Sequence, residues 1–224
     1  MEGTPDLSDP IMTPDAERER NVLFVIVLFH TVGLIGFIVL AFTVFFLKLV
    51  PWHLLLMLVI IIYNHKQLNG KFISFAITVF VLGFCAELTG VHTGLLFGSY
   101  NYGLTLGLKL WGIPLVIGIN WFLLIYSTGV LMQRSRVKNI FVRILTGALL
   151  LVLLDFFIEP VAIHFDYWHW AANGIPLKNY LCWFLISGAM LFIFEKFKFD
   201  MQNKAPVALL IMQFVFFMIL GLIY

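Results

Sequence analysis

The feature that most constrains this chain is its series of long apolar segments. Six stretches are long enough to cross a hydrocarbon core about 30 Å thick, because a helix rises about 1.5 Å per residue. They cover residues 22–47, 72–91, 110–132, 140–160, 181–197 and 205–224. A shorter apolar stretch, 50–64, follows Lys48, and its Pro51 suits the first turn of a separate helix. We therefore predict seven spans; joining this stretch to the first segment would leave six.

The supply and placement of charge agree with a membrane protein. Of the 224 residues, 62% are hydrophobic and 12% are charged, against about 25% charged in an ordinary soluble domain. Six of the 12 acidic residues lie within the first 20. This pattern excludes a soluble globular protein, a disordered chain and a nucleic-acid-binding protein. We predict an all-α, polytopic transmembrane helical bundle: residues 1–20 form an acidic, disordered cytoplasmic tail, and residues 21–224 form a single transmembrane domain.

The basic residues predict the orientation. With seven spans, one side of the membrane carries eleven lysines and arginines, and the other carries only Lys48, Lys109 and Lys178. Basic residues favour the cytoplasmic side. The N-terminus is therefore expected in the cytoplasm, the C-terminus outside, and the loops 92–109 and 161–180 on the outer side. The predicted location is the cytoplasmic (inner) membrane of the cell, with several passes.

Three carboxyl groups within the predicted spans carry the functional hypothesis. Glu87 lies near the outer end of the third span, and Asp155 and Glu159 lie four residues apart on one face of the fifth. Ionisable groups are costly in a bilayer, so each is a candidate functional residue. The alternative is a buried polar cluster that only holds two helices together.

The outer loops add polar and aromatic groups at the same depth. Residues 87–103 read ELTGVHTGLLFGSYNYG and contain His92, Tyr100 and Tyr102, with glycines that permit close backbone approach. The second loop, EPVAIHFDYWHW (159–170), contains Trp168. Five of the six tryptophans lie on or near this side. An interfacial aromatic belt would populate both sides, so the asymmetry indicates an aromatic-lined cavity.

This sequence lacks the residues that several other classes of membrane protein require. Cys85 and Cys182 form no CxxC pair, and no histidine pair has the spacing of a helical metal site, so we expect no disulfide and no metal. The last span has no lysine for a retinal Schiff base. DFFIE (155–159) is at most half of the paired Asp-rich motifs of a membrane prenyltransferase.

Four blocks of sequence resemble one family, the integral-membrane carotenoid 1',2'-hydratases, which includes γ-carotene and bisanhydrobacterioruberin hydratases. These blocks are ELTGVHTGLLFGSYNY (87–102), IPLVIGINW (113–121), DFFIEPVA (155–162) and IPLKNYLCWF (175–184). The resemblance extends from about residue 22 to the C-terminus. Asn120 departs from the family pattern, in which an apolar or small residue precedes Trp121.

The resemblance implies addition of water across the terminal C1=C2 double bond of a linear (ψ) carotenoid end group, with no cofactor. Removal from water favours the neutral form of a carboxyl group, which such a proton donor needs. Asp155 is the expected acid, supported by Glu159, and Glu87 orients or deprotonates the water. Aromatic faces can stabilise the tertiary carbocation. The expected substrate contacts are His92, Tyr100, Tyr102, Asn120, Trp121 and Trp168.

The expected partners are the lipid bilayer, a carotenoid dissolved in it, and other enzymes of the carotenoid pathway. Two other classes of function stay open at this point. One is a membrane protein that binds a carotenoid or lipid without catalysis. The other is a seven-span lipid hydrolase with a metal bound by His92, His164 and His169.

Overall fold

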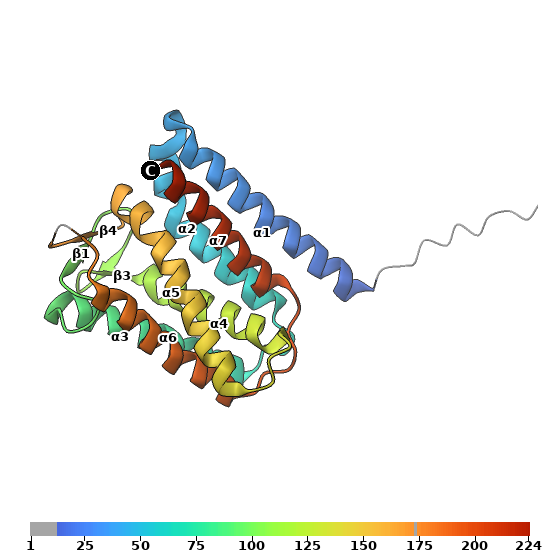
Figure 1. The fold of residues 1–224 in the computed structure, drawn as a ribbon. Helices are drawn as coiled ribbons and strands as arrows, with labels where there is room; N and C mark the ends of the chain where they lie inside the picture. The colour runs from blue at the N-terminus through green and yellow to red at the C-terminus, as the bar shows by residue number, and fades with distance from the viewer. Residues whose placement is uncertain (1–12, 173) are drawn as a thin grey trace, which may run out of the picture.

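The computed structural model describes residues 13–172 and 174–224, which form a bundle of seven helices (Figure 1). Each helix is long and apolar enough to cross a membrane, so the prediction of an all-α polytopic bundle with seven spans is confirmed. In chain order they are α1 (Pro14–Ile38), α2 (Leu40–Asn64), α3 (Gly70–Thr93), α4 (Leu115–Arg134), α5 (Ile140–His164), α6 (Leu177–Phe197) and α7 (Ala205–Ile223).

The first two spans differ from the prediction in where they divide. The break lies at Val39, which has an extended backbone (φ −83°, ψ 101°), and not at residues 48–49. Gly36 lies directly against the ring of Phe46, so the two helices approach closely just after the break. Pro51, expected in a first turn, lies inside α2. An internal proline removes one backbone hydrogen bond, which a transmembrane helix tolerates where neighbouring groups compensate.

The first helix also begins earlier than the predicted span. Residues 1–12 of the predicted acidic tail lie outside the described residues, but α1 already includes residues 14–20. Thr13 caps α1: its side-chain oxygen accepts a hydrogen bond from the Ala16 N–H.

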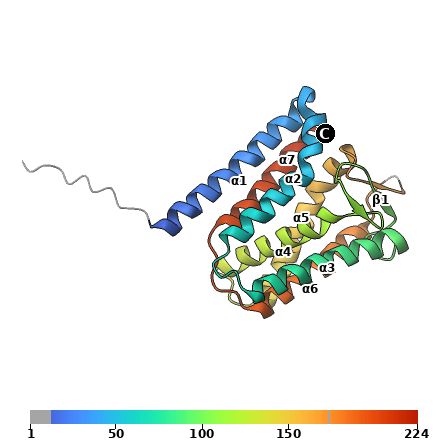
Figure 2. The same cartoon turned by 180° about the vertical axis from the view of Figure 1, so that it is seen from behind.

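Helix α4 occupies the centre of the bundle (Figures 1 and 2). It contacts α2, α3, α5, α6 and α7. In its most apolar stretch 78% of the residues are buried, against 11% in that of α2. The α1–α2 pair packs against α7 on one side of α4, and α3 and α6 lie on another side. Side chains of α4 can therefore contact groups from five of the other six helices.

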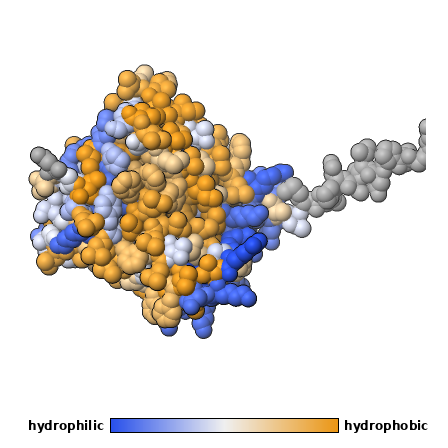
Figure 3. All heavy atoms as spheres, viewed as in Figure 1, coloured by the Kyte–Doolittle hydropathy of each residue, from blue (hydrophilic) through white to orange (hydrophobic). Residues whose placement is uncertain are grey.

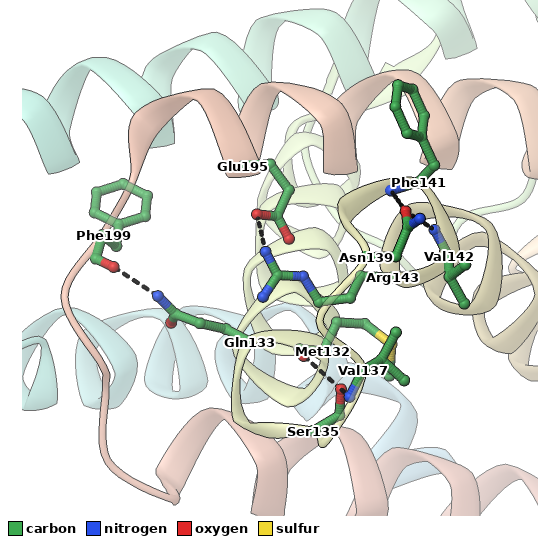
Figure 4. A network of polar contacts seen from close by, with 10 residues as sticks. All are labelled: Met132, Gln133, Ser135, Val137, Asn139, Phe141, Val142, Arg143, Glu195 and Phe199. Carbon is green, nitrogen blue, oxygen red and sulfur yellow. Dashed lines mark hydrogen bonds and ion pairs between the residues drawn. The ribbon is translucent and has the colours of Figure 1, made fainter.

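The surface carries an apolar band between two polar ends (Figure 3). At the N-terminal end, where α1, α3, α5 and α7 begin, a polar network joins the helix ends (Figure 4). Arg143 of α5 and Glu195 of α6 form a 2.6 Å ion pair, and the Gln133 amide donates to the Phe199 carbonyl at 2.6 Å. These contacts fix α4, α5 and α6 at the end opposite the predicted site.

Short strands order the connections at the other end. β1 (Tyr100–Tyr102) pairs antiparallel with β4 (Trp168–Trp170), and β2 (Lys109–Leu110) pairs with β3 (Ile113–Pro114). We call the first pair the β1–β4 ribbon. Asp166 secures it by accepting a hydrogen bond from the Leu104 N–H at 2.8 Å and pairing with His169. The Leu104 N–H is the main cause that holds the pKa of Asp166 below its usual value, and His169 is a further one. The carboxylate therefore stays charged.

Candidate functional site

The β1–β4 ribbon presents four aromatic side chains to the helices beneath it. In its register Tyr100 lies opposite Trp170 and Tyr102 opposite Trp168. Because side chains alternate along a strand, these four residues share one face. The intervening residues, Asn101 and His169, are exposed on the other face. The ribbon therefore forms an aromatic roof over the carboxyl groups of α3 and α5.

Glu87 accepts three hydrogen bonds from neutral donors. The hydroxyls of Tyr100 and Tyr102 donate to Oε2 at 2.5 and 2.7 Å, and Trp121 Nε1 of α4 donates to Oε1 at 2.9 Å. The side chain is almost completely buried. Burial, and then the Glu87 carboxylate, raise the pKa of Tyr100 and Tyr102, so both hydroxyls remain protonated donors.

Glu159 and Asp155 share a donor that sequence reasoning did not single out. Asn179 Nδ2 of α6 lies 2.6 Å from Asp155 Oδ2 and 3.2 Å from Glu159 Oε1. The other oxygen of Glu159 accepts from the indoles of Trp168 and Trp170 at 3.0 and 2.8 Å. In the sequence, Asn179 could be recognised as a candidate site residue only because it lies in the IPLKNY block that resembles the family.

Asp155 differs from the two glutamates in its surroundings. It is fully buried, and its Oδ1 is without a hydrogen-bond partner among the described residues. Glu87 and Glu159 line a small cavity, whereas Asp155 lies behind it, linked through Asn179. In the part of the chain that the structure describes, no ion pair reaches any of the three carboxyl groups. Among the described residues, their hydrogen-bond donors are neutral hydroxyl, indole and amide groups.

Close packing of α3 on α4 aims the indole of Trp121 at Glu87. Gly83 lies one turn before Glu87, and a Cβ added there would lie 2.5 Å from Trp121 Cβ. Trp121 also stacks on Trp183 of α6, with ring centroids 4.4 Å apart. A glycine on α3 and a tryptophan on α6 thus fix the position of this donor.

Two cavities with shared lining residues adjoin the site. The smaller, about 30 Å³, is lined by Glu87, Glu159, Asn179 and the aromatic roof; it has room for a water molecule, which needs at least about 10–15 Å³. The larger, about 350 Å³, is mainly apolar and lies between α1, α2, α4 and α7. Ile117, Asn120 and Trp168 line both. We call these three residues the neck.

Most of the predicted site residues are brought together, and one is not. These side chains form two neighbouring hydrogen-bonded groups, and Asn120 borders them at the neck. Glu87 accepts from Tyr100, Tyr102 and Trp121, whereas Glu159 accepts from Trp168 and shares the donor Asn179 with Asp155. We call the three carboxyl groups with these donors the acid cluster. His92 is exposed, and its Nε2 contacts the carbonyl of Trp111 at 2.9 Å. It lies outside the cluster because α3 continues past Glu87 by more than one turn before it ends at Thr93.

The three histidines considered for a metal have separate partners. His92 contacts Trp111, His164 stacks on Tyr224 with ring centroids 4.4 Å apart, and His169 pairs with Asp166. Within residues 13–172 and 174–224, no three histidine, cysteine or acidic side chains are placed to hold a metal ion. The placement of these residues does not favour a metal-dependent lipid hydrolase.

The seven apolar helices and the buried acid cluster define a multi-pass membrane protein with a polar site inside its apolar bundle. A family model described as "Carotenoid biosynthesis protein" matches residues 46–224. The chain therefore belongs to this family of carotenoid biosynthesis proteins, and the resemblance seen in the sequence is confirmed.

One relative has a more specific name. The chain is 31% identical over 132 residues to a bisanhydrobacterioruberin hydratase of Haloarcula japonica. The matched region covers 56% of this chain and 44% of that protein, which is less than half of the relative's length. No solved structure matches the chain.

Proposed function

We propose that this protein hydrates the terminal C1=C2 double bond of a linear carotenoid end group. The observation that carries the proposal is that the two cavities adjoin: a water-sized space bordered by two carboxyl groups shares the neck residues with an apolar space that suits a hydrocarbon chain. Membership in the carotenoid biosynthesis family and the likeness to a hydratase support the same reaction.

We assign the proton donor to Glu159 instead of Asp155, because Glu159 lines the cavity and Asp155 does not. The neutral Glu159 carboxyl transfers its proton to C2, which leaves a tertiary carbocation at C1. Trp168 lies at the neck beside this position, and an aromatic face attracts a cation. The cation can therefore form where an aromatic ring is already in place.

Water completes the reaction. A water molecule in the small cavity attacks C1, a C–O bond forms, and the proton released from the water passes to the Glu87 carboxylate. Both glutamates line the same cavity, so the proton can return to Glu159 through water between turnovers. Asp155 acts as a positioning residue, because Asn179 bridges it to Glu159.

The test is pigment analysis of cells that make lycopene or γ-carotene, with and without the protein. Chromatography and mass spectrometry should show a more polar product that is heavier by one water. Glu159→Gln and Glu87→Gln should each lower turnover by at least about 100-fold, the usual scale of a lost general acid or base. Glu17→Gln, an exposed and matched change at the start of α1, should leave turnover unchanged.

Asp155→Asn separates the two assignments of the acid. If Asp155 positions Glu159, the variant loses less activity than Glu159→Gln and its pH profile of kcat/KM shifts. A loss equal to that of Glu159→Gln, without such a shift, would return the proton-donor role to Asp155. Pigment of unchanged mass that co-purifies with the wild-type protein would instead identify a carotenoid-binding protein without catalysis.

We also propose that the protein lies in the cytoplasmic (inner) membrane, with its N-terminus in the cytoplasm. The eleven basic residues assigned to one side support this orientation. The acid cluster would then lie near the outer face, where water can reach it.

A further inference from the structure

The larger cavity has the size and lining of a ligand site. Its volume of about 350 Å³ falls within the range of small-molecule sites, which is about 300–1,000 Å³. Its walls are mainly apolar side chains of α1, α2 and α7. A helical bundle normally packs such a space closed, so an open space of this size indicates an occupant.

Some residues that line the cavity also reach the outer surface of α1 and α2. Four of its lining residues are also exposed: Phe29 and Val32 on α1 are 44% and 45% exposed, and Leu49 and Trp52 on α2 are 36% and 68% exposed. They stand on helices whose outer faces belong to the apolar band. We call these four residues the mouth.

An unpartnered polar group also lines the cavity. Gln213 of α7 is 7% exposed, and its Oε1 is buried with no hydrogen-bond partner in the described part of the chain. Buried amides are normally satisfied, so this oxygen requires a donor such as a water molecule in the cavity, because a hydrocarbon chain supplies none. The rings of His30 and His53, 4.6 Å apart, lie on the same wall.

Helix positions give the depth of the cavity below the acid cluster. A Cβ on Gly221 of α7 would lie 3.6 Å from Pro160, the residue after Glu159. Gln213 is two turns earlier in α7, which places it about 12 Å deeper along the helix axis. The cavity thus extends from the neck toward the middle of the bundle, along the direction that a chain would take behind a reacting end group.

We propose that this cavity is the binding site for the polyene chain of the substrate, and that the chain enters from the lipid through the mouth between α1 and α2. The identity of the chain rests on the proposed function. The end group passes the neck and reaches Glu159, while the polyene remains in the apolar cavity. An enzyme with this arrangement takes its substrate from the bilayer and never exposes the hydrocarbon to water.

Two variants test the cavity itself. Gly33 lines it from α1, and a Cβ added there meets only Phe216, at 3.7 Å; Gly33→Phe should therefore fill the space without disturbing the helix. Val32→Trp narrows the mouth at a lipid-facing position, where folding is not at risk. Val27→Phe, also lipid-facing on α1 but outside the cavity, is the matched control.

The measurement is the amount of carotenoid that co-purifies with each protein from lycopene-producing cells, in the Asp155→Asn background and in the wild type. Gly33→Phe and Val32→Trp should lower bound pigment at least about tenfold, a loss of about 1.4 kcal/mol in binding, whereas Val27→Phe should not. Equal pigment in all variants would overturn the inference, and co-purified phospholipid in place of carotenoid would do the same.

The same samples separate this inference from the proposed function. Hydration is read from the mass of the product made by the wild-type protein, and chain binding is read from the pigment retained. A protein that retains unaltered pigment in a cavity-dependent manner would sustain the binding site and overturn the hydratase. A hydrated product made equally well by Gly33→Phe and Val32→Trp would sustain the hydratase and overturn the binding site.

Discussion

At the scale of residues, the site depends on neutral donors that hold buried carboxyl groups. Glu87 and Glu159 each accept three hydrogen bonds from tyrosine, tryptophan or asparagine. Neutral donors satisfy the oxygen atoms without the fixed positive charge of a salt bridge. A carboxyl group in such a setting can exchange a proton during a reaction, whereas one paired with arginine would be locked in its charged form.

Gly83 gives a prediction at this scale. Gly83→Ala places a methyl group against Trp121, which must move, and its 2.9 Å hydrogen bond to Glu87 lengthens. We expect at least a tenfold loss of turnover and a lower melting temperature in detergent.

Gly188→Ala on α6 is the control for this substitution. A Cβ at Gly188 has no neighbour closer than 4.0 Å, so the change should raise stability by about 0.5–1 kcal/mol through its helix propensity. If Gly83→Ala also stabilised the protein and retained activity, close packing of α3 on α4 would not position Trp121.

At the scale of elements, the connections between helices also form contacts that hold distant parts of the chain together. The β1–β4 ribbon turns two loop segments about 70 residues apart into one aromatic face. The α2–α3 connection is similar at the opposite end: His65 stacks on Phe72 and forms a 2.7 Å hydrogen bond with the Tyr126 hydroxyl of α4. Each connection therefore joins helices that are distant in the sequence.

The α2–α3 connection predicts a pH dependence of stability. Burial lowers the pKa of His65 from 6.5 to about 4, so the folded protein holds this ring neutral while the unfolded chain takes up a proton below pH 6.5. The stabilisation is complete above pH 6.5 and is lost as the pH falls, by about 2 kcal/mol between pH 7 and pH 5. Unfolding of the detergent-solubilised protein at both pH values measures this loss.

His65→Gln keeps a polar partner for Tyr126 but does not titrate in this range. The variant should be less stable at pH 7 and should lose less stability than the wild type on acidification. An identical pH dependence in both proteins would show that other groups control the acid sensitivity.

At the scale of the whole molecule, seven spans place the two ends of the chain on opposite sides of the membrane. Tyr224 lies at the same end of the bundle as the acid cluster, with its ring against His164 and its hydroxyl on the Phe37 carbonyl. The basic residues predict that this end faces outward.

Reporter fusions test this orientation in cells. A reporter that is active only in the cytoplasm should work when fused before residue 14 and fail when fused after Tyr224, and a reporter active only outside should give the converse. Activity of one reporter at both ends would require an even number of spans and would contradict the seven-span bundle in the membrane.

Sequence reasoning alone gave the fold class and the number of spans, and it singled out the carboxyl groups and aromatic loops that the structure brings together. Span number, the carboxyl groups and the aromatic loops were all readable, because long apolar runs and costly buried charges leave strong local signals. The division of the first two spans at Val39 was not readable, because both flanking segments are uniformly apolar and Pro51 gave a stronger but misleading signal. Only packing, as of Gly36 against Phe46, separates the two possibilities.

Which side chains contact one another became clear only from the packing of the helices. His92 and Tyr100 stand in one loop motif, yet only Tyr100 reaches Glu87, because helix α3 extends beyond the acid and carries His92 outward. Asn179 joins Asp155 to Glu159 across 20 or more residues of chain, and the large cavity arises from helices at both ends of the sequence. Such contacts depend on how helices pack against one another, and that arrangement leaves no periodic trace in any single segment.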